Sequence, residues 1–497
     1  MDIKEIKPEK IFEIRGAKWL SGLSLALSLP YGGLFRQASY FNPFQRIGFL
    51  EPTPAITELG SGTINTSKVI RHIIPFWKPA GSLPYAYVYA DDNKLYETDF
   101  NNVTDVSAQI NTATTTARGF GLWKSGVVYV QDTQARFNAI PVASGSDVQV
   151  LTGLTSAEHP TVVGSDKNFY IGDDDSVAKL TSSTGTSGNS IDVFLLESGF
   201  KIRKLINDGR YLVILADNAV IKTNYAQKNR CQVLYWDMVK GTADYIYEFA
   251  DGFIAGGEMI GDIIEFLTPS GKYITSAGTK PKLILPFIEN TSSAVIASSN
   301  VPTSFSLITT HRNILHWGVG NAPGEDPVYA HGSLAEGLPK ITFNPYAVTG
   351  LSANKYLTAI GSNNSEFLMA TGTGSSDVKL YSATLSSSNS SCVINICNID
   401  FPQTFKFEFA KVILKTRISS GNSVALQILS EGDAKTIKSS ETKTNTTDSG
   451  RKELTFRPQG ATAQFFDELS TIKLTTNVAV QALEIYGTPT TQQGQYV

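Results

Sequence analysis

The chain has 497 residues, with 42 basic and 45 acidic side chains, a formal net charge of −3 and 41% hydrophobic residues. This charge balance does not favour a general nucleic-acid-binding surface, and the length is enough for two or three domains with a large core. Only three cysteines occur, which excludes a disulfide framework. Short β-rich runs separated by Gly, Ser, Thr and Asn indicate an all-β protein.

Residues 1–60 are predicted to form an irregular N-terminal arm or strap, because they lack periodicity and are dense in Gly, Pro and aromatic residues. Such a segment is too apolar to stay solvated and cannot build its own core. We therefore expect residues 31–52 to be buried, mostly at a contact outside their own domain. The apolar run Trp19–Pro30 is too short to span a membrane, and the acidic residues before it disfavour a signal peptide.

A short pattern of an apolar run, a polar turn and a weaker second run recurs between residues 85 and 356. Its first five copies follow one another at a constant step of 42 residues, and two more copies follow after steps of 61 and 42; the copies begin at Tyr85, Val127, Phe169, Tyr211, Phe253, Ile314 and Tyr356. About 42 residues hold four short strands, which is one blade of a β-propeller. The spacing predicts a propeller of about seven blades over residues 61–395, with residues 68–77 as an early strand. Each of the first five anchors should start an equivalent strand in successive sheets, and another multi-sheet β architecture is the alternative.

Three features inside this region bear on possible sites. The excess in the sixth unit, around residues 319–337, predicts a long loop that is either functional or a tolerated surface insertion. Asp173–Asp175 are expected to form a solvated hairpin turn; the alternative is a calcium site, which would need six or more oxygen ligands. His311 and His316 should lie on opposite faces of one strand because of their odd spacing, which argues against a metal site.

The pattern changes near residue 400. Five runs with alternating polarity predict a C-terminal β-sandwich over residues 400–487, with strands at 405–416, 423–429, 452–458, 469–476 and 479–487. Residues 437–451 are expected to be a solvated hairpin tip, and residues 488–497 a flexible or partner-anchored tail. Cys392 and Cys397 should lie on opposite faces of a strand, so that they and Cys231 are free, buried thiols.

The sequence offers no catalytic, cofactor-binding or metal-binding residue. The phosphate-binding loop, the dinucleotide fingerprint, the zinc-protease helix motif and the nucleophile elbow are all missing. The paired carboxylates of a glycosidase leave no local motif, so that class of enzyme is not excluded by the search. We expect a protein that is not an enzyme and holds no cofactor.

Residues 17–55 resemble the opening of a group of tailed-bacteriophage virion proteins. In those proteins a Trp- and Gly-containing segment leads to a Gly-Gly or Gly-Ser-Phe element, an aromatic Pro-Phe stretch and a Gly-x-Leu-x-Pro segment before a propeller. The residues that carry the likeness are Trp19, Gly22, Gly32, Gly33, Phe35, Asn42, Pro43, Phe44, Gly48, Leu50 and Pro52. The C-terminal run ending in Leu483-Glu-Ile-Tyr-Gly487 is similar to the terminal module of such proteins. Asn42 stands where those proteins often have Asp, a small change for a turn.

The resemblance implies a structural virion component of a tailed phage, in the tail or at a head-to-tail connection. Its partners would be copies of itself, in a homo-oligomeric ring, and other virion proteins. The same interpretation expects no small-molecule substrate, no membrane insertion and no sequence-specific nucleic-acid binding. The alternative from another class is a carbohydrate-binding or carbohydrate-degrading propeller at the host surface, which would need exposed aromatic platforms or convergent carboxylates.

Overall fold

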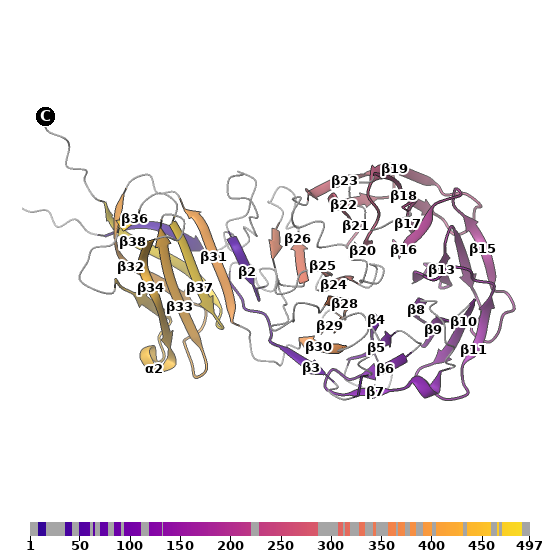
Figure 1. Ribbon diagram of the computed structural model, residues 1–497, viewed down its shortest axis with the longest axis horizontal. Coiled ribbons are helices and arrows are strands. Elements are labelled where there is room, and N and C mark those ends of the chain that lie inside the picture. The colour runs from indigo at the N-terminus through magenta and orange to yellow at the C-terminus, as the bar shows by residue number, and fades with distance from the viewer. Residues whose placement is uncertain are drawn as a thin grey trace, which may run out of the picture. The chain divides into compact units, whose positions relative to one another are not determined.

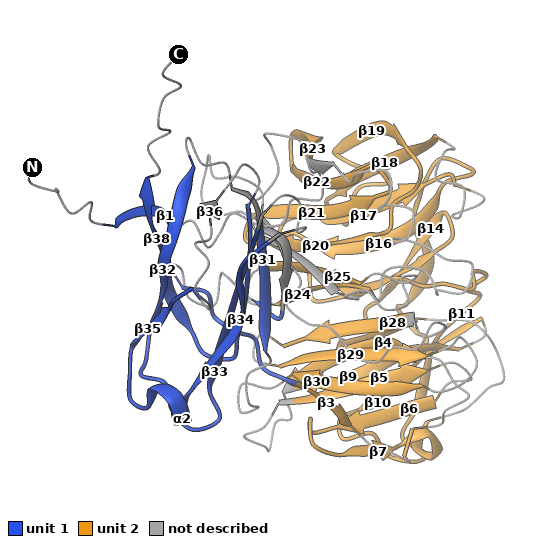
Figure 2. Ribbon diagram, turned by 60° about the vertical axis from the view of Figure 1, so that its left-hand side comes forward, with its two compact units in different colours: residues 1–55, 329–347, 386–497 blue, residues 56–328, 348–385 orange. Residues whose placement is uncertain are grey.

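The computed structural model divides into two compact units (Figure 2). Unit 1 comprises residues 1–55, 329–347 and 386–497, and unit 2 comprises residues 56–328 and 348–385. The structure describes residues 8–15, 35–41, 49–59, 63–64, 70–77, 84–90, 94–110, 119–131, 133–219, 228–286, 307–311, 314–318, 328–332, 341–343, 356–363, 366–372, 378–383, 391–399, 404–430, 435–458, 465–466 and 470–489.

The described strands between residues 56 and 383 form seven four-stranded antiparallel sheets (Figure 1). Sheets one to three contain β4 (Ile70–Trp77), β5 (Pro84–Ala90), β6 (Lys94–Thr98) and β7 (Val103–Asp105); β8 (Gly119–Trp123), β9 (Gly126–Gln131), β10 (Gln134–Ala139) and β11 (Val148–Thr152); and β12 (Thr161–Val163), β13 (Phe169–Asp173), β14 (Ser176–Leu180) and β15 (Ser190–Leu195). One turn of 3-10 helix, η3 (Ser107–Gln109), follows the first sheet.

The later sheets repeat this order. Sheets four to six contain β16 (Lys201–Asn207), β17 (Leu212–Asp217), β18 (Asn229–Trp236) and β19 (Tyr245–Asp251); β20 (Gly256–Ile260), β21 (Ile263–Thr268), β22 (Gly271–Ser276) and β23 (Thr279–Pro286); and β24 (Ile308–His311), β25 (Ile314–Gly318), β26 (Val328–Gly332) and β27 (Ile341–Phe343). The seventh combines β28 (Tyr356–Ser362), β29 (Phe367–Gly372) and β30 (Lys379–Ala383) with β3 (Ile56–Leu59), which comes from before the first sheet.

Burial explains why these runs form stacked sheets. Every residue of β9, β13, β17 and β29 is buried, so these second strands are covered on both faces, whereas the fourth strands β15 and β19 are mostly exposed. Separate hydrophobic clusters lie between consecutive sheets, and one of them joins the first sheet to the last. A strand buried on both faces needs the continuous apolar run that sequences such as VVYV and LVIL supply.

The sheets close into a ring. The first strands of neighbouring sheets lie against one another in the order β4, β8, β12, β16, β20, β24 and β28, and β28 in turn lies against β4. Closure is completed by β3, which pairs with β30 so that Leu59 is opposite Leu380 and Glu58 forms an ion pair of 2.8 Å with Lys379. Four-stranded sheets arranged radially around a centre define a β-propeller, and the predicted propeller is confirmed.

The repeat prediction fails in detail at its fifth and seventh copies, whereas the sixth, Ile314, starts the second strand β25 of its sheet. Val127 and Phe169 lie in second strands, and Tyr211 immediately precedes one, but Phe253 precedes β20, which is the first strand of its sheet. The equivalent position there is Ile263 in β21. The step lengthens because residues 218–228 separate β17 from β18, while the apolar and turn residues around Phe253 imitate a second strand. Tyr356 is likewise in the first strand β28.

Unit 1 contains two five-stranded sheets. One has the order β1 (Glu9–Arg15), β38 (Val480–Pro489), β32 (Phe405–Leu414) and β35 (Glu453–Phe456), with β36 (Phe465–Phe466) also paired to β32; the other has the order β2 (Phe35–Ser39), β31 (Cys392–Ile399), β37 (Ser470–Thr476), β33 (Ser423–Ser430) and β34 (Lys435–Thr444). The short helix α2 (Asn445–Asp448) follows β34. The expected C-terminal strands are therefore present, and β31 moves the start of this region to before residue 395.

Two expectations about unit 1 are wrong. Residues 437–451 are not a hairpin tip, because β34 pairs with β33 and Lys438 is fully buried beside Glu441 at 2.8 Å. A polar sequence can form this strand because β34 lies at the edge of its sheet. The arm is also not irregular throughout, since β1 pairs with β38 and β2 with β31.

Two described apolar side chains of the arm are buried inside its own unit. Phe41 and Leu50 are 1% and 0% exposed, and they form bridges with Pro52 and Val480 of the same unit. The expected burial of residues 31–52 outside their own domain does not hold for these two side chains. Val480, the partner of Leu50, lies hundreds of residues away, so no local pattern in the arm could reveal it. Residues 16–34, 42–48 and 490–497, which include the tail, lie outside the described residues.

The closing seam between β28 and β4 predicts a specific sensitivity. A Cβ atom on Gly361 would stand 2.6 Å from the carbonyl oxygen of Ile73 and 2.7 Å from its Cγ2. Gly361→Ala should therefore lower the free energy of unfolding of the propeller by about 1–3 kcal/mol, measured by urea titration. Gly185→Ala is the matched control, because a Cβ there meets nothing within 4 Å. Equal unfolding midpoints for the two variants would contradict the close approach of β28 and β4.

Candidate functional site

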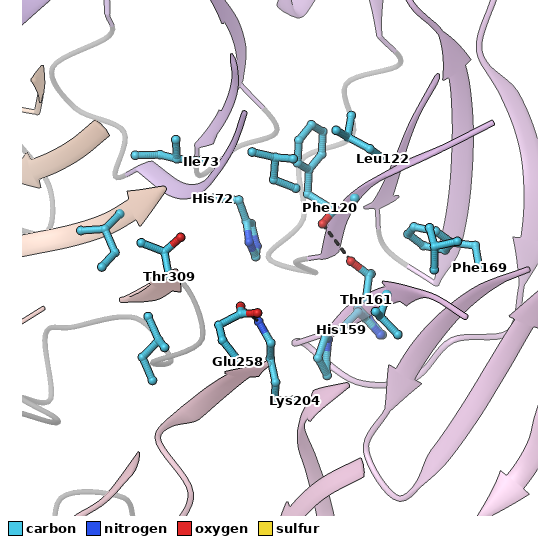
Figure 3. Close-up of a pocket in the computed structure, with 17 residues that line it drawn as sticks. His72, Ile73, Phe120, Leu122, His159, Thr161, Phe169, Lys204, Glu258 and Thr309 are labelled. Carbon is cyan, nitrogen blue, oxygen red and sulfur yellow. Dashed lines mark hydrogen bonds and ion pairs between the residues drawn. The ribbon is translucent and has the colours of Figure 1, made fainter. Parts of the chain in front are cut away.

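A cavity of about 300 Å³ lies in unit 2 among the first strands of the sheets (Figure 3). Most of its lining comes from β4, β8, β12, β16, β20, β24 and β28, which are the seven strands that form the inner ring, and Phe169 of β13 and the residues 159–160 before β12 complete it. The half-buried side chains around it include the apolar Ile74, Leu122 and Val163 and the polar His72 and Thr309. The cavity is thus a product of ring closure, since each strand contributes only one to three lining residues.

The charged groups of the cavity are Lys204 on β16 and Glu258 on β20. Figure 3 shows the two side chains directed toward one another, and Lys204 Nζ donates a hydrogen bond of 2.6 Å to Glu258 Oε1. The pair is partly shielded, with side-chain exposures of 17% and 29%. It joins two consecutive sheets across the lining and leaves this part of the cavity without net charge.

A buried ion pair next to Lys204 fixes the local backbone. The register of β16 against β17 shifts between Ile202 and Lys204, which leaves Arg203 outside the regular pairing. Arg203 then donates from Nη2 to Asp217 Oδ1 at 2.8 Å and to the Ala219 carbonyl oxygen at 3.0 Å. Because a bulge re-aims the side chains beside it, this irregularity holds Arg203 against Asp217 while Lys204 reaches the cavity.

Other side chains tie neighbouring inner strands together around the cavity. The Thr161 hydroxyl donates to the Phe120 carbonyl oxygen at 2.9 Å, joining β12 to β8. The Asn207 amide donates to the Val163 carbonyl oxygen at 2.9 Å, joining β16 to β12. With the Lys204–Glu258 pair, these contacts connect four consecutive sheets through side-chain hydrogen bonds, which supplement the apolar packing between them.

The three aspartates do form a turn, but only in part a solvated one. Asp173 ends β13 and is buried, and its carboxylate accepts hydrogen bonds from the backbone N–H groups of Thr155 and Ser156 at 2.6–3.0 Å. Asp174 has a positive φ of 56° and forms an ion pair of 2.9 Å with Lys201. Within the described ranges, no group of three or more His, Cys, Asp or Glu side chains is placed to hold a metal ion.

The two close histidines lie on different strands, which corrects the expectation that they share one. His311 ends β24 and His316 is in β25, and their ring centroids are 5.5 Å apart at 80°. The hairpin between them accounts for the odd spacing. The expected loop at 319–337 is interrupted by β26, while residues 319–327 and 333–337 lie outside the described residues.

Free thiols are found where they were expected. Cys231 and Cys392 are buried and unbonded to other cysteines, and burial raises the pKa of both thiols. The side chain of Cys397 lies outside the described residues. Among the described residues no helix is long and apolar enough to cross a membrane.

His159 lines the cavity region and is fully buried. Its Nδ1 is 3.1 Å from the Gly172 carbonyl oxygen, which can only accept a hydrogen bond, so Nδ1 carries the proton in the neutral ring. Burial lowers the pKa of His159 below its usual value near 6.5, while Asp173 at 3.7 Å acts in the opposite direction. The ring is therefore held neutral in the folded protein.

This neutral histidine predicts a dependence of stability on pH. The unfolded chain takes up a proton at His159 near pH 6.5, whereas the folded chain does so only at lower pH, so stability falls as the pH drops from about 7 to 5. His159→Gln should reduce this loss of unfolding free energy. The reduction is at most about 1.4 kcal/mol for each unit by which folding lowers the pKa of His159. Urea unfolding at several pH values and the NMR titration of the His159 ring measure the effect. A ring that titrates at or above pH 6.5 in the folded protein would contradict it.

Sequence reasoning did not identify Lys204 or Glu258. The segment Lys201–Asn207 contains two lysines, and nothing local distinguishes a lysine that faces solvent from one that faces a central cavity. Only the register shift in β16 and the closure of the ring bring these two charges together. That the protein has no catalytic or cofactor-binding residue stays a prediction.

No protein-family model and no curated protein sequence matches the chain. Several solved structures are similar in fold. The WD40 domain of Neurospora crassa Pan2 is 8% identical, with a TM-score of 0.43 over 67% of this chain and 96% of that domain. YCF48 bound to D1 peptide is 10% identical, with a TM-score of 0.44 over 71% of this chain and 99% of that one. BBS1N in complex with ARL6DN is 8% identical, with a TM-score of 0.41 over 69% of this chain and 98% of that one.

These likenesses concern the fold alone. The assignment of a β-propeller follows from the seven four-stranded sheets and from the contacts that close them into a ring.

Proposed function

We propose that this protein is a non-enzymatic structural component of a tailed-phage virion, located in the tail or at a head-to-tail connection. The observation that carries the proposal is the resemblance of residues 17–55 to the opening of such virion proteins. The fold is compatible with this role, because that opening contributes β2 to a sheet of unit 1 and leads directly into the strand that closes the propeller.

The finer architecture belongs to the same proposal. We infer that the seven four-stranded sheets are the seven blades of one propeller and that the two five-stranded sheets of unit 1 pack face to face as a sandwich. Strands β32 and β37 support the sandwich, because buried and half-buried residues alternate along them. Such alternation is typical of a sheet with one face in a core and the other facing outward.

The mechanism in this proposal is mechanical. A closed propeller is rigid, since its sheets are packed on both faces, and it presents turns and outer strands to neighbouring proteins. Exposed apolar side chains lie on the outer strands of the third and fourth sheets, where Leu195 and Ile246 are 61% and 56% exposed. Partner proteins of the particle, including further copies of this chain in a ring, would cover them, because exposed apolar groups gain most when buried at an interface.

Glycan degradation receives less support than a structural role. Hydrolysis of a glycosidic bond needs two carboxylates flanking the bond. Glu258 is the only carboxylate among the described residues that line the cavity. A rim that binds an extended glycan chain would need exposed aromatic platforms, and Tyr245 is the one exposed large aromatic side chain in the described part of the chain.

The proposal predicts that the protein is a stoichiometric component of purified particles, detected by mass spectrometry and located by gold-labelled antibody at the tail. The double variant Leu195→Glu and Ile246→Glu should fold normally, because both side chains are exposed, but should enter particles poorly, since it places two charges at an apolar contact. Lys280→Glu, at another exposed position, is the control.

The outcomes separate two parts of the proposal. Absence of the wild-type protein from particles would overturn the virion role. Normal incorporation of the double variant, with the wild-type protein present, would show that the outer strands of the third and fourth sheets make no essential contact.

A further inference from the structure

The cavity at the centre of the propeller contains polar groups whose hydrogen-bonding capacity is not used up by the protein. Lys204 has three N–H donors, and one of them is donated to Glu258 Oε1. The Glu258 carboxylate can accept several hydrogen bonds on its two oxygens, and Lys204 supplies one. A donor and an acceptor therefore stand side by side on one wall of a cavity of about 300 Å³.

The charge balance of this wall selects the class of ligand. Because Lys204 and Glu258 are 2.6 Å apart, an anion would be attracted by one and repelled by the other, and the same holds for a cation. A neutral group that both donates and accepts hydrogen bonds meets neither penalty. Two adjacent hydroxyl groups satisfy this condition, since one can donate to the Glu258 carboxylate while the other accepts from the Lys204 ammonium group.

The remaining walls fit the rest of such a ligand. Ile74, Leu122 and Val163 are half-buried lining residues that offer apolar surface to the C–H groups of a sugar ring, and the Thr309 hydroxyl can donate or accept one further hydrogen bond. Figure 3 shows Thr309 and the Lys204–Glu258 pair around the same hollow. The volume lies at the lower end of the range of about 300–1,000 Å³ for ligand pockets, which suits a single ring rather than a chain of sugars.

We propose that the central cavity is a binding site for one neutral pyranose sugar, held through a pair of adjacent hydroxyl groups by Lys204 and Glu258. This site goes beyond the structural role proposed above and does not depend on it, because the residues that form it lie in the cavity lining and not on the outer strands. Binding involves no covalent step. In a virion protein it would allow a terminal sugar of a surface polysaccharide to be recognised.

The test uses the full-length protein and three probes, D-glucose, D-galactose and N-acetyl-D-glucosamine, with binding measured by saturation-transfer NMR and titration. At least one probe should bind in the millimolar range or tighter. Lys204→Met should weaken it at least about tenfold, because hydrogen bonds to a charged group are lost. Glu258→Gln, which keeps an acceptor oxygen, should weaken it less than Glu258→Leu. Lys179→Met removes a comparable ion pair with Asp166 at 2.9 Å outside the cavity and should leave binding unchanged.

Each other result counts against the site. The proposal is overturned if none of the three sugars binds at concentrations up to about 100 mM, or if binding persists in Glu258→Leu. Binding of acetamide in place of the sugars would assign the cavity to an amide ligand instead. Circular dichroism of every variant shows whether it is folded, and Glu258→Gln keeps the comparison informative if the larger changes unfold the protein. Particle incorporation can succeed or fail independently of these results.

Discussion

The pairing of β3 with β30 is the contact on which the rest of unit 2 depends. It joins residues more than 300 positions apart, as the Glu58–Lys379 ion pair across a sequence separation of 321 illustrates. A propeller without closure would expose the faces of its first and last sheets, together with the apolar cluster that contains Ile70, Val88 and Leu368. The hydrogen bonds between β3 and β30 hold the last sheet beside the first and so remove that exposure. Closing the ring therefore also buries this part of the core.

Closure also creates the central cavity, one wall of which carries Lys204 and Glu258. Lys204 and Glu258 come from separate sheets and approach to 2.6 Å because consecutive sheets are held by packing and by contacts such as Thr161 to Phe120. The buried Arg203–Asp217 pair serves this geometry by fixing the irregular part of β16. Removing one member of this pair would leave the other as an uncompensated buried charge.

The sequence was sufficient for the class of fold and for most strands. The apolar run at Val127–Val130 predicted a strand of the propeller, and the alternation in residues 405–416 predicted a strand of the C-terminal region; the structure has β9 and β32 at these places. It was insufficient wherever pairing is non-local. The partner of Leu50 and the place of β3 in the last sheet depend on residues hundreds of positions away, and local polarity carries no signal for them. The sequence also missed β34, because the polar residues of this edge strand look like a solvated turn although they pair with β33.

The same limit applies to the cavity. Its walls take one to three residues from each of seven strands, so no spacing along the chain distinguishes Lys204 from the exposed lysines of the surface. The equal step of 42 residues could locate four of the sheets but not the fifth, because a longer connection before β18 shifted the register of the repeat. The number of residues between equivalent strands depends on the lengths of the loops as well as of the strands. Loops change length at little cost in free energy, so the step need not stay constant.

Engineered disulfides across the closing strand test the account most directly. In the structure Thr57 is opposite Ser382 and Glu58 is opposite Tyr381. Cysteine pairs at 57 and 382, or at 58 and 381, should form a disulfide on mild oxidation and raise the unfolding temperature, whereas a pair at 57 and 381, on opposite faces of the sheet, should not. If neither directly opposed pair cross-links, or if the mismatched pair does so equally well, β3 does not close the propeller and the central claim is wrong.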